Sequence, residues 1–341
     1  MKMRKTIITV ALVAAVTGCV KIGEETTPSG VSPKEEFNAW LETFHKDLVG
    51  KSVYPGYYIL EESEGSGAAV GNSETNAYAK VSYTCYSLSG SILNSTEEDA
   101  ARRLGTFKKY HYYGASTMLR GSGNSYAGID EAISTMKIGG HKKIIIPGWL
   151  LTNSRYATED EYIANFGGGS AAIYDLKVED AFSDVTKHQI DSIERYISRV
   201  YKEKPDSLKY GFYKIRTGEP SSDIEIPKDS TVYINYICRR LDGTAVDSNI
   251  RDTAERYGFR NDANSYTPVS ANYAENYTDI TITSNKTSVI GGFALLLKNM
   301  KPHEKASGIF YSNLGYGTQA SSSIPAFSPL RFDIELVDKP Q

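Results

Sequence analysis

Two stretches of the sequence carry hydrogen-bonding side chains in the same order and at the same spacing. Residues 79–95 and 232–248 share a tyrosine, a cysteine, a glycine and a serine at matching positions. The residue before the shared serine is Asn94 in the first stretch and Asp247 in the second. The tyrosine and serine hydroxyls and the asparagine amide can donate and accept hydrogen bonds, and the aspartate carboxylate accepts them. The repetition indicates a chain built from two related domains.

Other kinds of chemistry find little support in the sequence. The five histidines are scattered, with no pair at metal-ligand spacing, so we expect no metal site and no cofactor. The glycines at 167–169 lack the strand-to-helix context that a phosphate-binding loop needs. The net charge is −3 and the basic residues are dispersed, which argues against nucleic acid as a partner. Cys85 and Cys238, one in each copy, are predicted to be small buried hydrophobic residues.

Both copies show the same order of helices and strands. Each opens with an amphipathic helix, and capping-box spacing occurs at Ser32 with Glu35 and at Thr186 with Gln189. A short helix with one buried face is predicted after Gly128 and again in the second copy. With so few helical connections, the strands are expected to form antiparallel sheets in an α+β fold. The main strands are predicted at residues 142–147, 173–178, 305–311 and 330–337.

A series of short motifs in the second copy resembles the FKBP-type peptidyl-prolyl isomerases. It covers residues 230–338, whereas residues 56–179 resemble the family more weakly, mainly through the repeat. The resemblance implies two FKBP-like domains, each with an antiparallel sheet of five to six strands wrapped around a short helix and preceded by an amphipathic helix. The motifs, in family order, are Val232-x-Ile-x-Tyr236, Asp242-Gly-x-x-Val-Asp-Ser248, Val289-Ile-Gly-Gly-Phe293, Leu314-Gly-Tyr-Gly317, Ile324-Pro325 and Phe332-Asp-Ile-Glu-Leu336.

The resemblance also implies where the site lies, in a pocket between the sheet and the short helix of the second domain. Its catalytic residues would be Tyr236, Asp247, Phe293 and Tyr316. From periodicity alone, the apolar residues Val246, Val289, Ile290 and Phe332 are better interpreted as core. The substrate-binding residues carried over from the family are Val246, Ile280, Val289, Ile290, Ile324 and Phe332, and the corresponding set in the first domain is Tyr83, Leu93, Asn94, Ile129 and Tyr174.

The activity implied by the resemblance is rotation about the peptide bond before proline. That rotation breaks no bond, so it requires no nucleophile and no cofactor. Its barrier is about 20 kcal/mol because the planar amide is conjugated. An apolar site that binds the twisted amide more tightly than the planar one would lower this barrier. Phe293 stands where the family usually has tryptophan, which keeps an aromatic floor but gives up the indole donor.

The first domain departs further from the family pattern. Asn94 replaces the acid, Ile129 replaces the aromatic floor, and a loop is predicted at residues 151–169 where the Tyr-Gly motif should be. We therefore expect little or no isomerase activity from this domain.

Both domains carry a tyrosine-rich insertion after the shared serine, at about residues 96–117 and 249–279. In the family this region is a flap beside the pocket. Tyrosine is favoured at binding interfaces, but these insertions can also be interpreted as packed loops. An alternative function is therefore a non-catalytic binding module that presents its flaps to a protein or glycan.

The N-terminus has the features of an export signal. A basic start and a short apolar run precede Cys19 in a sequence that resembles a bacterial lipobox, so residues 1–18 are predicted to be a signal peptide and Cys19 to carry lipid. An ordinary signal peptide with a chance cysteine is the alternative. Val20 after the cysteine favours the outer membrane of a bacterial envelope, with proline-containing segments of exported proteins as partners. The expected divisions after the signal are a tether at 19–32, a domain at 33–182, a linker helix at 183–209 and a domain at 210–341.

Overall fold

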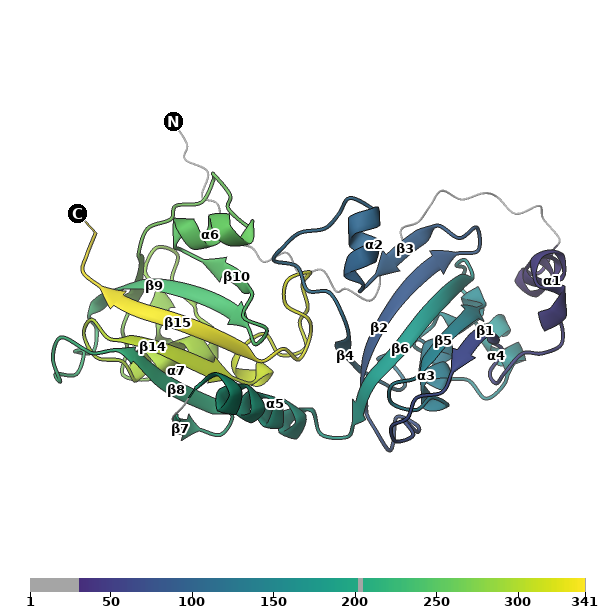
Figure 1. Cartoon of the computed structure of the whole chain (residues 1–341), viewed down its shortest axis with the longest axis horizontal. Coiled ribbons are helices and arrows are strands. Elements are labelled where there is room, and N and C mark those ends of the chain that lie inside the picture. The colour runs from purple at the N-terminus through teal and green to yellow at the C-terminus, as the bar shows by residue number, and fades with distance from the viewer. Residues whose placement is uncertain (1–30, 202–204, 341) are drawn as a thin grey trace. The chain divides into compact units, whose positions relative to one another are not determined.

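The computed structural model describes residues 31–201 and 205–340. These divide into two compact units (Figure 1). The N-terminal unit contains residues up to Phe107 together with Tyr113–His188. The C-terminal unit contains Gln189 onward and the short segment Lys108–Tyr112. The proposed signal peptide and Cys19 lie outside the described residues.

The N-terminal unit is a six-stranded antiparallel sheet with a few short helices. The strand order is β1-β5-β6-β2-β3, with β4 also paired to β2. The strands are β1 (Tyr58–Ser63), β2 (Tyr78–Ser87), β3 (Ile92–Ser95), β4 (Ser116–Leu119), β5 (His141–Ile146) and β6 (Ala172–Phe182). The helices are α1 (Pro33–Phe44), α2 (Glu98–Arg103), α3 (Ala127–Ser134) and α4 (Glu159–Ala164), with single turns η1 (Lys46–Leu48) and η2 (Gly148–Leu150).

Local sequence determines where α1 begins. The Ser32 side chain accepts a hydrogen bond from the Glu35 backbone, and the Glu35 carboxylate accepts one from the Ser32 backbone, with Pro33 in the first turn. The predicted capping box is therefore confirmed. One face of α1 buries Phe37 and Leu41 in the core of this unit.

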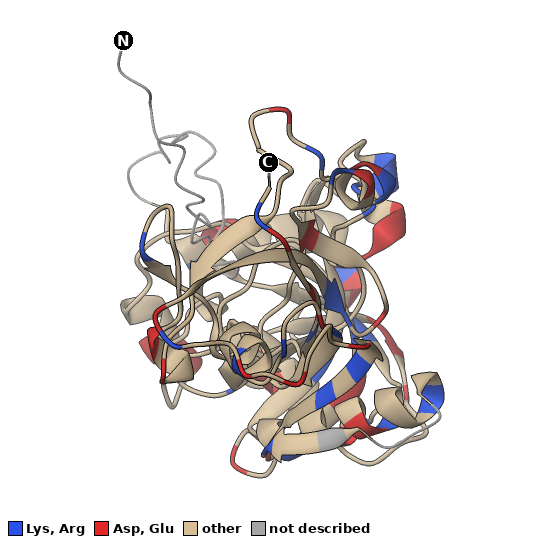
Figure 2. Cartoon of the chain, turned by 90° about the vertical axis from the view of Figure 1, so that its left-hand side faces the viewer, with Lys and Arg blue, Asp and Glu red and all other residues tan. Residues whose placement is uncertain are grey.

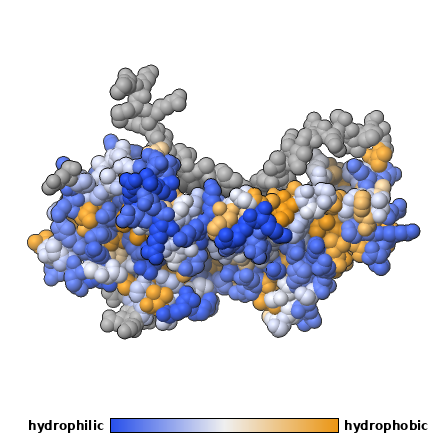
Figure 3. Space-filling model, turned by 45° about the horizontal axis from the view of Figure 1, so that its top comes forward, coloured by the Kyte–Doolittle hydropathy of each residue, from blue (hydrophilic) through white to orange (hydrophobic). Residues whose placement is uncertain are grey.

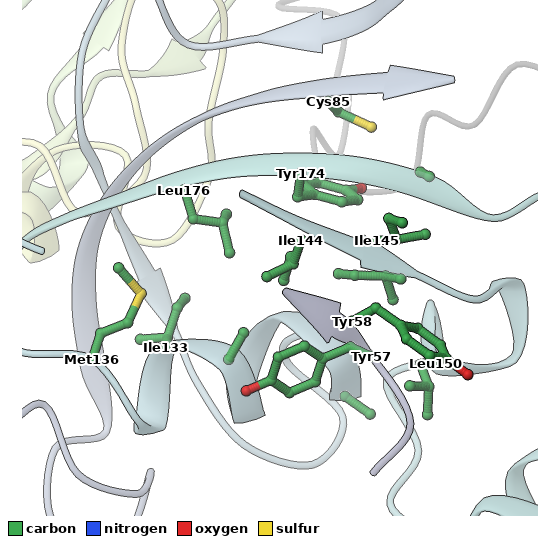
Figure 4. Packing of buried hydrophobic residues seen from close by; sticks show 14 of the residues in the cluster. Tyr57, Tyr58, Cys85, Ile133, Met136, Ile144, Ile145, Leu150, Tyr174 and Leu176 are labelled. Carbon is green, nitrogen blue, oxygen red and sulfur yellow. The ribbon is translucent and has the colours of Figure 1, made fainter. Parts of the chain in front are cut away.

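The core of the N-terminal unit lies between the sheet and α3 (Figure 4). Ile133 of α3 and Ile144 of β5 are fully buried there, and Met136 and Leu176 are nearly so. A side chain at Gly128 would clash with Ile146, so glycine lets α3 approach the sheet closely. The helix predicted after Gly128 is confirmed.

The C-terminal unit repeats this architecture with additional edge strands. Its sheet has nine strands in the order β13-β12-β11-β9-β15-β14-β8-β7, and β10 also pairs with β9. The strands are β7 (Asp206–Lys209), β8 (Phe212–Gly218), β9 (Thr231–Arg240), β10 (Ala245–Ser248), β11 (Val269–Asn272), β12 (Thr281–Ile282), β13 (Thr287–Ser288), β14 (Lys305–Phe310) and β15 (Leu330–Val337). The helices are α6 (Arg251–Tyr257) and α7 (Gly291–Lys298), with single turns η3 (Tyr277–Asp279) and η4 (Ser312–Leu314).

The two sheets have the same connectivity over six strands. The path β1-β5-β6-β2-β3 in one unit corresponds to β8-β14-β15-β9-β10 in the other, and β4 corresponds to β11. The α+β prediction with two antiparallel sheets, each holding one short core helix, is therefore confirmed. The C-terminal sheet exceeds the expected five to six strands because β7 extends one edge and β12 with β13 extends the other.

Helix α5 (Val185–Val200) begins differently from the prediction. The Asp184 carboxylate, and not Thr186, caps it by accepting a hydrogen bond of 2.9 Å from the Lys187 backbone. Gln189 is then free for another role: its side-chain amide donates to Ser312 Oγ at 3.0 Å and accepts from the Ser312 backbone at 2.7 Å. The helix also buries Ile193 and Tyr196 in a small core with β8 and β14.

Charge and cysteine placement agree with expectation. Figure 2 shows basic and acidic residues lying next to one another on the ribbon. Cys85 and Cys238 are both buried, as predicted. Among the helices of residues 31–201 and 205–340, none has the length and apolar character needed to cross a membrane.

Candidate functional site

The predicted pair Tyr236 and Asp247 is brought together on adjacent strands. Asp247 of β10 faces Cys238 of β9 in the strand register, and the Tyr236 hydroxyl donates a hydrogen bond of 2.9 Å to Asp247 Oδ2. A β-bulge at Val246 interrupts the register just before Asp247. The bulge buries Val246 and leaves Asp247 with an accessible surface.

The electrostatics around this pair are unusual because no cation balances the carboxylate. Within the described part of the chain, no Lys or Arg side chain contributes to the pKa shift of Asp247. Burial of its carboxyl group raises the pKa of Asp247, even though part of this residue is accessible to solvent. Hydrogen bonds from Tyr236 and from the Ser248 backbone act in the opposite direction and lower this pKa. Burial, and then the adjacent negative charge, raise the pKa of the Tyr236 hydroxyl. The hydroxyl therefore remains a proton donor over the physiological range.

Two side chains directly after Asp247 hold the backbone of Tyr236. The Ser248 hydroxyl donates to the Tyr236 carbonyl at 2.7 Å, and the Asn249 side chain accepts from the Tyr236 amide at 2.8 Å. Asn249 also donates to the Ile234 and Thr267 carbonyls. Buried Asn249 thus supplies the hydrogen-bond partner that a neighbouring strand would give the Tyr236 amide, and it links this tyrosine to Thr267 inside the insertion. The repeated serine pointed to this role, but nothing in the sequence singled out Asn249.

An aromatic cluster forms the apolar part of the site. Phe293, at the start of α7, meets Tyr236 edge-on with ring centroids 6.0 Å apart and Phe332 of β15 edge-on at 5.5 Å. Tyr236 and Phe332 lie nearly parallel at 6.1 Å. Phe310, which was not predicted, stacks behind Phe332 at 5.9 Å. Such offset and edge-to-face pairs are favourable geometries for aromatic rings.

The remaining predicted residues surround the same cluster. Val246 and Ile280 are buried in it, while Val289, Ile290, Tyr316 and Ile324 pack against it half-buried. The structure therefore brings together all ten predicted residues of the second domain, with Asp247 joined through its hydrogen bond to Tyr236. A side chain at Gly292 would clash with Phe310, so α7 can approach β14 only with glycine there.

Tyr316 supplies a second hydroxyl to this site. It follows η4, and burial raises its pKa above the usual value for tyrosine. No hydrogen bond from another described residue contributes to that shift, so the hydroxyl is available as a donor to a bound group.

No cluster of metal-binding side chains is present in residues 31–201 and 205–340. The arrangement can bind a small apolar ring and donate hydrogen bonds to a carbonyl beside it.

The N-terminal unit has a counterpart of the hydrogen-bonded pair. Asn94 faces Cys85 in the register, and its amide donates to the Tyr83 hydroxyl at 3.1 Å. Tyr174 lies 5.9 Å from Tyr83, in the place of Phe332. Leu93 sits at the equivalent bulge but is 49% exposed, so its predicted place in an apolar lining is wrong. Ile129 stands on α3 where Phe293 stands on α7, which leaves this site without its aromatic floor.

The two units differ most in the segments that follow the turns η2 and η4. Thr152 follows η2 at the distance at which Tyr316 follows η4. The predicted loop at 151–169 contains α4, which begins at a capping box between Thr158 and Glu161. That spacing was visible in the sequence and could have indicated the helix.

A buried ionic network further separates the N-terminal unit from its counterpart. Asp130 of α3 pairs with Arg120 at 2.7 Å and with Arg155 at 3.0 Å, and Arg120 also donates to Ser134. The position of Asp130 on α3 is occupied by Ala294 on α7. The polar network therefore fixes α3 and the following loop where the C-terminal unit has apolar packing.

Comparison with known proteins identifies the C-terminal unit. Residues 222–337 match the model of the family described as FKBP-type peptidyl-prolyl cis-trans isomerase. They include every predicted site residue of the second domain, so this unit carries an FKBP-type domain, and the shared strand order gives the N-terminal unit the same fold. No curated protein gives a significant match.

Three solved structures illustrate the likeness, at TM-scores too low to support an argument. The three FKBP domains of wheat FKBP73 are 15% identical over 82% of this chain and 93% of that one, with a TM-score of 0.29. FkpA from Escherichia coli is 26% identical over 45% and 62%, with a TM-score of 0.31. A peptidyl-prolyl cis-trans isomerase from Pseudomonas syringae is 20% identical over 45% and 94%, also at 0.31.

Proposed function

We propose that the C-terminal unit is a peptidyl-prolyl cis-trans isomerase that acts on proline-containing segments of exported proteins. The observation that carries this proposal is the joining of an aromatic cluster to two tyrosine hydroxyls and a carboxylate, inside the segment that matches the family model. The arrangement provides an apolar surface for a proline ring and hydrogen-bond donors for the neighbouring carbonyl.

The mechanism follows from differential binding. The planar prolyl amide is polar and conjugated, whereas the twisted transition state has lost its resonance. An apolar surface made by Phe293 and Phe332 solvates the planar amide poorly but accepts the proline ring in either state. The enzyme therefore binds the twisted state more tightly than the planar one, which accelerates rotation in both directions.

Each polar residue has a separate role in this mechanism. Tyr316 donates its hydrogen bond to a substrate carbonyl and fixes the peptide relative to the ring. Asp247 orients the Tyr236 hydroxyl through the 2.9 Å hydrogen bond and holds its ring against Phe293. The N-terminal unit lacks the equivalents of Phe293 and Tyr316, so we assign it little or no isomerase activity.

The proposed setting is a bacterial envelope. Lipid on Cys19 would hold the chain at a membrane, with the outer membrane favoured by Val20. Exported proteins fold at that location, and uncatalysed prolyl isomerisation takes about 10–100 s. An anchored isomerase would shorten those steps.

NMR exchange spectroscopy of a proline-containing peptide tests the activity directly. The wild-type chain should accelerate cis–trans exchange, and Tyr316→Phe should weaken the acceleration while leaving the fold intact. Tyr233→Phe is a matched control, because Tyr233 lies on the same strand as Tyr236 but outside the aromatic cluster. Absence of acceleration by the wild-type chain would overturn the enzyme proposal.

The second candidate is a non-catalytic binding module. Its support is phenylalanine at the floor position. The second flap gives it less support, because two of its tyrosines already have partners. Tyr273 is buried and donates to the Lys298 carbonyl, and Tyr257 accepts a hydrogen bond from Arg239. If the wild-type chain binds the peptide without accelerating exchange, this second function is the correct one.

A further inference from the structure

Helix α1 carries more apolar surface than the core of its unit covers. Phe37 and Leu41 are buried, whereas Trp40 is half-buried and Phe44 is 66% exposed. Trp40 and Phe44 lie one helical turn apart, with ring centroids 5.7 Å from each other. The two rings therefore form a continuous aromatic strip along the outer edge of the helix.

Past the end of α1 and the turn η1, Val49 is a further apolar side chain that is 44% exposed. Figure 3 shows hydrophobic groups in orange on the surface of the N-terminal unit, at the right. Helical periodicity places Glu35 and Glu42 on the side of α1 away from Trp40, whereas Glu36 lies one turn before Trp40 on the same side. Beyond Glu36, the side of the helix that carries Trp40 and Phe44 has no acidic residue up to the end of α1, which leaves this part suited to an apolar or interfacial partner.

The position of α1 in the chain indicates what that partner is. Only residues 19–32 separate Cys19 from the helix, and a fully extended chain of that length spans at most about 50 Å. A lipid on Cys19 would hold α1 close to the bilayer and give contact a high effective concentration. Tryptophan and other aromatic residues are favoured at the membrane–water interface, where a ring contacts apolar chains and polar headgroups together.

We propose that Trp40, Phe44 and Val49 form a membrane-docking strip that lies against the lipid headgroup layer. This inference rests on the lipid attachment proposed above. Docking through α1 would fix the orientation of the N-terminal unit on the bilayer, which a tether alone does not do.

Tryptophan fluorescence tests this proposal, because the chain has only two tryptophans, Trp40 and Trp149. Trp149 is 3% exposed and packs edge-on against Phe37. The chain beginning at Cys19 would be coupled through that thiol to a maleimide lipid in phosphatidylethanolamine–phosphatidylglycerol vesicles, since Cys85 and Cys238 are buried. Such coupling supplies the anchor whether or not cells lipidate the protein, and the mass of the native N-terminal peptide tests natural lipidation separately.

In the Trp149→Phe variant, replacing the lipids with brominated ones should reduce Trp40 emission about twofold. Adding Phe44→Ser should remove most of that loss. Ile224→Ala is the matched control, because Ile224 is 71% exposed but lies in the C-terminal unit. It should leave the loss unchanged, and the Trp40→Phe variant, which reports Trp149 alone, should show none.

Equal Trp40 emission in brominated and ordinary vesicles would overturn the proposal. So would a change in Trp40 emission with protein concentration in the absence of lipid, because that result would identify a second copy of the chain as the occupant. Since Trp149→Phe alters a buried site, backbone hydrogen exchange of α1 in the coupled wild-type chain gives an independent measurement. The exchange should slow at Trp40–Phe44 on vesicles, and unchanged rates would count against docking.

Discussion

The two units place a tyrosine and a short polar side chain at the same two positions, but they surround these residues with different chemistry. In the C-terminal unit the Tyr236 hydroxyl donates to a carboxylate, and Phe293 and Phe332 complete an apolar cluster. In the N-terminal unit an amide donates to Tyr83, and Ile129 replaces the floor. The shared pair therefore belongs to the architecture of the sheet, whereas the residues on and after the short helix determine what the site can bind.

The largest expected effect concerns the ionic network around Asp130, whose position on α7 is occupied by Ala294. Asp130→Ala should lower the free energy of unfolding of this unit by about 3–5 kcal/mol, because it leaves Arg120 buried without its counter-charge. Both tryptophans lie in the N-terminal unit, so urea unfolding followed by tryptophan fluorescence reports that unit alone.

The control for Asp130→Ala is Asp160→Ala, since the Asp160 side chain is 91% exposed. It should leave the midpoint almost unchanged. A similar shift for both variants would show that the network does not distinguish the N-terminal unit energetically.

The next effect concerns Asn249, which holds the Tyr236 backbone. Asn249→Ala should cost about 1–3 kcal/mol, because the buried Tyr236 amide loses its acceptor. Asn249→Thr should recover part of this, since Thr96 accepts from the Tyr83 amide at 2.8 Å in the N-terminal unit. Unfolding of the C-terminal unit, followed by amide hydrogen exchange of β9, measures both. Equal losses for alanine and threonine would contradict the equivalence of the two positions.

A smaller effect is expected on catalysis. Asp247→Ala should reduce the acceleration of prolyl exchange about tenfold, because the Tyr236 ring loses the group that orients it. Asn94→Ala, the same change at the equivalent position of the N-terminal unit, should leave the acceleration of the full chain unaffected. NMR exchange rates on one peptide measure both. Equal losses would mean that both units contribute to activity.

The smallest effect tests whether the acid alone makes the difference. Asn94→Asp in a chain that already carries Asp247→Ala should restore no measurable exchange, because Ile129 and Thr152 still stand where the floor and the second hydroxyl are needed. Recovery of activity in that double variant would show that Asn94 is the decisive departure of the first domain.

Local patterns predicted much of this molecule. The helix after Gly128 and the Ser32 cap depend on residues within a few positions of one another, and the structure has both. The predicted start of α5 was wrong because two nearby residues, Asp184 and Thr186, could each have capped the helix. Asp184 makes the cap, while Gln189 is engaged by Ser312, a residue distant in sequence.

The site residues likewise divide into those that local sequence patterns located and those that they did not. The repeat and the family resemblance located Tyr236 and Asp247, since their strands carry recognisable motifs. They did not locate Asn249, whose partners lie on β9 and inside the insertion, or the network around Asp130, which joins three separate segments. Contacts of that kind depend on tertiary packing, which periodicity does not report.

The placement of α5 has a practical consequence for defining the smallest piece of chain that can fold independently. The family match begins at residue 222, yet β8 ends at Gly218 and forms part of the sheet, and Gln189 holds the turn that leads to Tyr316. A fragment cut at the edge of sequence similarity would lack β8 and expose the apolar side of β14 that Ile193 covers. A C-terminal fragment that folds on its own should therefore begin at Asp184, which caps the first turn of α5.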